Sequence, residues 1–294
     1  SSDVCSSDLV ILVFASLSGF SQPDIRDTAR LKNIIDTATG GTKALAMQKF
    51  AFAISDWQPR RAQGYYEKAL EIAQHAGADT AANTVRNQMM NFYSELGDLR
   101  KALAFRQQVD TTMFGQNPQL PVLFFYYSGV IFSRLEKTDS AMLFFEKSLQ
   151  LAIQQGDSTQ QAANYNGIAI TAESEMNYEK ALKNYKHTYR IMTKLQNQHG
   201  KAITLNNLGT VNRKMGDYLT AVEHFKQAIV LNKQLGFLTQ LTANYLNIAI
   251  TYTYLDSLPT SEGYAQKALQ LCRDAKIDRT LPKIHNQLGN IYHL

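Results

Sequence analysis

Small and aromatic residues recur about every forty residues along this chain and mark the same positions each time. The clearest copy reads Leu208-Gly209, Gly216-Asp217-Tyr218, Ala221, Phe225 and Ala228. Ala221, Phe225 and Ala228 stand at i, i+4 and i+7, so they share one face of a helix. Gly209, on the preceding helix, has no side chain, so an aromatic ring can pack directly against the helix backbone there. The pattern therefore predicts an antiparallel pair of helices joined by a short turn at residues 215–217.

The same pattern, stepped along the chain, predicts an all-α array of six full repeats and a truncated seventh over residues 42–294. The copies differ in quality, because Phe50 stands at the glycine position of the first and Arg106 replaces the usual aromatic residue of the second. The last copy holds Gly289 and Tyr292 without a second helix to cover its apolar face. Since a solenoid normally ends in a polar cap, we expect the sequence to be a fragment of a longer protein.

Helix start and stop signals share this period. Short polar side chains stand near the start of the predicted second helices, where they can accept hydrogen bonds from backbone N–H groups. These predicted caps are Asp98, Asp139, Asn177 and Asp217. Glycines follow the repeat alanine by fifteen residues, where a helix can end in a left-handed conformation. These predicted C-terminal caps are Gly77, Gly156 and Gly236.

These residues together resemble the tetratricopeptide repeat (TPR), whose pattern is Leu-Gly, an aromatic, Gly-Asp-Tyr, Ala, an aromatic and Ala. The resemblance covers roughly residues 42–294. It implies an α-α solenoid in which helical hairpins stack into a right-handed superhelix. The usual period is ~34 residues, so the longer period here implies that each helix is longer by nearly a turn, as in the extended-helix TPR variants that often bind peptides.

The N-terminal segments are expected to have a different origin. Residues 1–9, SSDVCSSDL, resemble the translation of a sequencing adapter, and we set them aside as an artefact. Residues 10–21 are apolar and end in small residues, which suits the remnant of a signal peptide; the alternative is a buried strand or helix. Residues 22–41 are expected to form a capping helix or a linker. A signal peptide predicts an exported protein, either periplasmic or anchored on the outer side of a membrane.

Charge and motifs exclude several function classes. The net charge of +5 is modest and its cations are spread along the chain, so nucleic-acid binding is not expected. No phosphate loop, zinc-protease, nucleophile-elbow or EF-hand motif is present. The six histidines include no i, i+4 pair that could chelate a metal, and Cys272 is expected to be a buried structural thiol. We therefore expect a non-enzymatic segment with no cofactor and no metal.

The resemblance implies that the first helices of successive repeats line a concave groove that binds a protein or peptide. Asparagines gather three residues before the repeat glycine and at nearby positions of those helices. The candidate binding residues are Asn87, Asn91, Tyr126, Asn166, Asn206, Asn207, Arg213, Asn247, Asn286 and Asn290. Because asparagine both donates and accepts, such a ladder can bond an extended peptide backbone. The alternative is that these side chains bond helix ends or neighbouring repeats.

Two functional classes follow from the resemblance. The first is the extracytoplasmic sensor region of a bacterial signalling protein, in which long TPRs precede a transmembrane helix and a histidine kinase or helix-turn-helix output domain. The second is a free-standing exported scaffold that assembles proteins. Family members that clamp acidic chaperone tails carry lysine three residues before the repeat glycine. This chain has none there, so that partner class is not expected, and the sequence assigns no oligomeric state.

Overall fold

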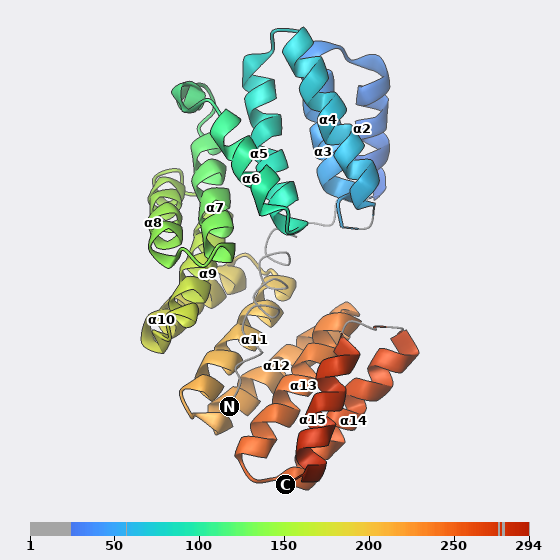
Figure 1. The fold of residues 1–294 in the computed structure, drawn as a ribbon, viewed down its shortest axis with the longest axis vertical. Helices are drawn as coiled ribbons and strands as arrows, with labels where there is room; N and C mark the ends of the chain where they lie inside the picture. Colours follow the sequence, from blue (N-terminus) through green and yellow to red (C-terminus); the bar gives the residue numbers. More distant parts are fainter. Residues whose placement is uncertain (1–24, 57, 276, 278–279, 294) are drawn as a thin grey trace. The chain divides into compact units, whose positions relative to one another are not determined.

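The computed structural model describes residues 25–56, 58–275, 277 and 280–293 (Figure 1). The predicted artefact and signal-peptide segments lie outside these residues. Over the described residues the chain is helical and contains no strand. It divides into two compact units, Ser1–Gly167 and Ile168–Leu294, with the boundary inside one helix, α9 (Ser158–Ser174).

The helices of the first unit follow one another as hairpins. Their bounds are α2 (Ile25–Thr37), α3 (Gly40–Ile54), α4 (Pro59–His75), α5 (Asp79–Glu95), α6 (Leu99–Gln108), the 3-10 helix η1 (Thr111–Gln116), α7 (Gln119–Arg134) and α8 (Thr138–Gln154). Within the hairpins α3 packs on α4, α5 on α6 and α7 on α8, while α2 packs on α3. The first helices also pack on one another, α3 on α5 and α5 on α7.

The second unit repeats the arrangement. Its helices are α10 (Tyr178–Lys194), α11 (Gln198–Lys214), α12 (Tyr218–Leu235), α13 (Leu238–Tyr254), α14 (Leu258–Ala275) and α15 (Leu281–His293). The hairpins α11–α12 and α13–α14 are formed, and the first helices α11, α13 and α15 pack in succession. With α9 and α10 as a further pair, the described residues hold six full hairpins and the first helix of a seventh. The all-α solenoid prediction is confirmed.

Glycine and phenylalanine fit together inside the hairpins as the pattern predicts. Phe225 is fully buried, and a Cβ added at Gly209 would lie 2.6 Å from its Cε1 atom. The ring of Phe145 lies against two glycines, because a Cβ would come within 2.7 Å of it at Gly129 and 2.5 Å at Gly167. Only glycine leaves room for the aromatic ring at this depth, so these contacts fix how closely the helices approach.

Most of the predicted caps are confirmed. The side chains of Asp98, Asn177 and Asp217 accept hydrogen bonds from the backbone N–H groups three residues further on. The prediction for Asp139 is wrong, because α8 begins at Thr138 after Lys137, and Asp139 lies inside the first turn. Asp139 precedes its repeat alanine by two residues, whereas the three true caps precede theirs by four. The predicted C-terminal glycines are also confirmed, since Gly77, Gly156 and Gly236 have φ angles of 60°, 68° and 71°.

The second hairpin departs from the others after its shortened helix α6. The irregular chain beyond α6 is held by Asn83 of α5, whose Nδ2 donates to the carbonyl of Asp110 at 2.8 Å. The Asp110 N–H donates back to Asn83 Oδ1 at 2.7 Å. Arg106, in the place of the repeat aromatic, lies over the rings of three phenylalanines at 4.9 to 5.4 Å from their centroids. Its Nε donates to Ser128 Oγ at 3.0 Å, so the cation is accommodated by rings and a hydroxyl.

Candidate functional site

The candidate site is the surface formed by the first helices of the hairpins, which we call the first-helix surface. In the second unit its centre is Asn206 on α11. The Oδ1 atom of Asn206 accepts from Asn244 Nδ2 at 2.9 Å and from Asn247 Nδ2 at 2.8 Å, both on α13. Asn232 of α12 donates in turn to Asn244 Oδ1 at 2.7 Å. We call these four residues the asparagine cluster; it joins two hairpins and fixes the amide orientation of Asn206.

Charged residues continue this surface on α9 and α11. Lys214 Nζ lies 3.0 Å from Glu173 Oε1, and the hydroxyl of the buried Tyr185 donates to Glu173 Oε2 at 3.0 Å. Burial, followed by the nearby Glu173 carboxylate, raises the pKa of Tyr185 well above its usual value. Tyr185 is therefore a hydrogen-bond donor at neutral pH. Glu173 has both carboxylate oxygens engaged, and Lys214 and the half-buried Arg213 are the cations of this region.

In the first unit, the corresponding side chains of α7 are aromatic and buried. Tyr126 and Tyr127 on α7 are 4% and 6% exposed, and burial raises the pKa of both phenols. The Tyr127 hydroxyl donates to Gln88 Oε1 on α5 at 3.4 Å. Arg134, at the end of α7, donates through Nη1 to the backbone carbonyl of Ser94. These hydrogen bonds join α5 to α7. Because both tyrosines are buried, little of their surface can contact a partner.

The predicted binding residues fall into three groups. Six of them are buried: Asn87, Asn91, Tyr126, Asn166, Asn207 and Asn247. Asn206 and Arg213 are partly exposed, while Asn286 and Asn290 on α15 are exposed. Burial leaves little of these six side chains for a partner, so the predicted ladder is accessible chiefly at the other four residues. The sequence also offered the alternative that these asparagines bond neighbouring repeats. The asparagine cluster is bonded in this way.

The contacts between hairpins follow the repeat period. The bonded pairs Tyr127–Gln88 and Asn244–Asn206 are 39 and 38 residues apart in sequence. Asn247 and Asn206 are separated by 41. The sequence reasoning missed Asn244 and Asn232, the buried members of the asparagine cluster. A comparison of polar residues within two or three positions of one period would have found Asn244 from Asn206, because such residues lie close together on adjacent first helices.

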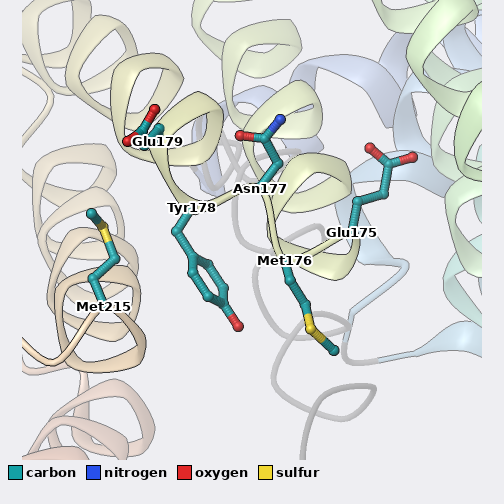
Figure 2. A pocket seen from close by; sticks show the side chains of 6 residues that line it. All are labelled: Glu175, Met176, Asn177, Tyr178, Glu179 and Met215. Carbon is teal, nitrogen blue, oxygen red and sulfur yellow. The ribbon is translucent and has the colours of Figure 1, made fainter.

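A surface pocket of about 570 Å³ lies beside the turns of two hairpins in the second unit (Figure 2). Figure 2 shows the Tyr178 ring between Met176 and Met215, with Glu175 and Glu179 at the edge. Met176 is 75% exposed, so much of the apolar lining faces solvent. The pocket has carboxylates at its edge and no nucleophile–base pair, which leaves the first-helix surface as the stronger candidate for function.

Among the described residues, no group of three or more His, Cys, Asp or Glu side chains could hold a metal ion. None of the described helices combines the length and the apolar character needed to cross a membrane. Cys272, predicted to be a buried thiol, is buried.

Comparison with known proteins supports the repeat assignment. Residues 159–234 match the family profile described as tetratricopeptide repeat. The chain is similar to the 43 kDa receptor-associated protein of the synapse from Tetronarce californica, with 28% identity over 173 residues. That alignment covers 57% of this chain and 41% of the relative, so the chain spans less than half of the relative's length.

Two solved structures share the fold. One is the STAND signal-transduction ATPase with a tetratricopeptide repeat sensor from Pyrococcus horikoshii, with a TM-score of 0.70 and 16% identity, covering 97% of this chain and 41% of that one. The other is aspartyl phosphate phosphatase F from Bacillus subtilis, with a TM-score of 0.66 and 15% identity, covering 98% of this chain and 80% of that one. At such low identity the likeness concerns the fold alone.

Proposed function

We propose that this chain binds a protein or peptide on its first-helix surface and catalyses no reaction itself, because residues 159–234 match the tetratricopeptide repeat profile and the described helices pack as successive hairpins. Asn206 is the observation that carries the proposal. Its Oδ1 is already occupied by two neighbouring amides, so the partly exposed side chain has its Nδ2 group to offer as a donor. A donor whose orientation is fixed in advance loses little entropy when it binds a backbone carbonyl.

The other accessible groups of this surface in the second unit have the same character. Arg213 and Lys214 are donors only, and Asn286 and Asn290 can donate and accept. A surface rich in donors suits a partner that presents backbone carbonyls or acidic side chains, as an extended peptide does. The partner proposed here is therefore a polypeptide that contributes more acceptors than donors.

A site-specific photo-crosslinker tests the location of binding. Placed at Asn286, which is exposed on α15, it should capture a defined protein partner that can be identified by mass spectrometry. The matched control is the same crosslinker at Lys226, exposed on the second helix α12. Once the partner is identified, Asn286→Ala with Asn290→Ala should lower its affinity. Equal capture at both positions, or an unchanged affinity, would remove the first-helix surface as the binding site.

As to biological context, we propose an exported sensor region of a bacterial signalling protein. The apolar residues 10–21 motivate export, and the STAND protein of similar fold uses its tetratricopeptide repeats as a sensor. The alternative is an exported assembly scaffold, which agrees with the similarity to a receptor-associated protein. Sequencing the gene beyond codon 294 distinguishes them: a transmembrane segment and an output domain support the sensor, and a stop after a polar capping helix supports the scaffold.

A further inference from the structure

A row of positive charges lies on the solvent-exposed face of α10. Lys183, Lys186, Arg190 and Lys194 are all exposed. Their spacing of three, four and four residues places them on one side of the helix, in a line along its axis. We call these four residues the α10 basic row. It lies on a second helix and so is separate from the first-helix surface.

The basic row has little compensation from its own helix. Glu179 stands four residues before Lys183, but no acidic residue lies three or four positions from Lys186, Arg190 or Lys194. Like charges four residues apart destabilise a helix. In the part of the chain that the structure describes, the four side chains make no ion pair or hydrogen bond with another group. The row is therefore only partly offset within its own helix, by Glu179 near its start and by the helix C-terminus near Lys194, where cations are favoured.

These cations affect the pKa of two neighbouring histidines. The pKa of His187, on the same helix, is lowered by partial burial and then by Arg190 and Lys183. The pKa of His224 on α12 is lowered by burial; Lys186 lowers it further, while Glu223 and Asp217 raise it. Lys183, Lys186 and Arg190 therefore lie near two histidines of this region.

The second helices α12 and α14 carry no such row of cations. The exposed residues of α12 include Glu223 as well as Lys226, and those of α14 include Asp274 as well as Arg273. Mixed signs are what a solvated helix face usually carries. The basic row is thus a property of α10 and not a consequence of the repeat.

We propose that the α10 basic row binds an acidic helical segment of a partner protein. Carboxylates at i, i+4 and i+8 of a helix are spaced by about 6 Å, given a rise of about 1.5 Å per residue. Lys186, Arg190 and Lys194 have the same spacing, so two such helices can pair charge for charge. Electrostatic complementarity of this kind guides association and selects the partner.

Two other anionic partners fit the row less well. Single-stranded nucleic acid needs aromatic side chains on which bases stack, and the nearby Tyr189 is half-buried with Lys201 Nζ 5.8 Å from its ring centroid. Membrane-surface helices insert large apolar side chains beside their cations. Between Lys183 and Lys194 the other exposed side chain is Thr193, which is polar, and a single exposed apolar side chain, Leu195, follows the row. The observations therefore favour a protein partner.

The test uses a synthetic helical peptide with glutamate at every fourth position, labelled for fluorescence anisotropy. The whole chain should bind this peptide at low ionic strength, more weakly at about 0.15 M salt, and should not bind the same peptide with glutamine in place of glutamate. The variant Lys186→Glu with Arg190→Glu should lose roughly tenfold or more in affinity, because attraction becomes repulsion at the centre of the row.

The matched control is Lys226→Glu with Arg273→Glu, which changes the net charge equally at exposed sites outside the row. It should leave the affinity within about twofold, since distant exposed charges are screened. Circular dichroism confirms that both variants fold. Equal weakening by the two variants, no binding of the peptide, or binding confined to single-stranded DNA or phosphatidylserine vesicles would each overturn the proposal. Because the partner-capture experiment at Asn286 probes another surface, either proposal can fail alone.

Discussion

At the residue scale, Gly209 is one of the positions where hairpin packing tolerates little change. A Cβ there would lie 2.6 Å from Phe225 Cε1, and Phe225 is fully buried. Gly209→Leu must therefore displace the ring or separate α11 from α12. We expect it to lower the free energy of unfolding by about 1–3 kcal/mol, measured by urea denaturation followed by circular dichroism.

The chain offers a control for this substitution at the equivalent position of α15. A Cβ added at Gly289 meets no other atom within 4 Å, so Gly289→Leu should not destabilise the protein by overpacking. It replaces a glycine inside a helix by a better helix former, which favours the folded state by roughly 0.5–1 kcal/mol. If the two leucine variants lost the same stability, the close contact between Gly209 and Phe225 would not be the cause.

His199 is a residue whose environment predicts a pH dependence. Its ring centroid lies 4.4 Å from that of Phe237, and burial lowers its pKa below the usual value. The unfolded chain, with a histidine pKa of about 6.5, then binds more protons than the folded chain once the pH falls below this value. Stability from the neutral ring is complete above that pH and is lost as the pH decreases toward the folded pKa.

We therefore expect the free energy of unfolding to decrease between pH 7.5 and 5.5, and His199→Gln to make this decrease smaller. His187 and His224 also have lowered pKa values, so part of the pH dependence should persist in the variant. Parallel curves for the two proteins would mean that His199 does not contribute.

At the scale of the helices, the asparagine cluster couples α11 to α13. Asn206→Ala would leave the donors of Asn244 and Asn247, both buried, without their acceptor. A buried group that loses its partner costs about 1–3 kcal/mol, so we expect a loss in that range or above. Asn286→Ala, at an exposed residue, should change stability by less than about 0.5 kcal/mol. Chemical denaturation of the two variants measures the difference.

A double-mutant cycle tests whether the cluster acts as a unit. Asn244→Ala in addition to Asn206→Ala removes a donor together with its acceptor, so the combined loss should be smaller than the sum of the two single losses. Additive losses would mean that the two side chains stabilise their helices independently.

The hairpins were predictable from sequence because each is specified locally. Gly209 and Phe225 lie sixteen residues apart, and the same pairing recurs at Gly129 and Phe145. Burial of the first-helix asparagines could not be predicted in the same way. Asn206 is accessible or covered depending on side chains one repeat away, such as Asn244. The two hydrogen bonds between Asn83 and the backbone of Asp110 were missed for a similar reason, since they depend on where the shortened helix α6 ends.

At the scale of the whole molecule, the polar contacts between neighbouring first helices run from one hairpin to the next. Pairs such as Tyr127–Gln88 in the first unit and Asn247–Asn206 in the second are separated by about one repeat. A chain stabilised in this way resembles a one-dimensional array, in which each hairpin depends on its immediate neighbours. Local damage in such an array should remain local, whereas a single compact core would spread it.

Hydrogen exchange in Gly209→Leu tests this expectation. Overpacking at Gly209 should reduce the protection of backbone amides in α11 and α12, and to a smaller extent in α13, which packs on both. The hairpin of α3 and α4 makes its contacts within the first unit, and its exchange should match that of the unmodified chain, because local opening does not require distant hairpins to open. Exchange read by mass spectrometry, peptide by peptide, separates the two regions. A uniform loss of protection across all helices would mean that the array unfolds as one cooperative unit.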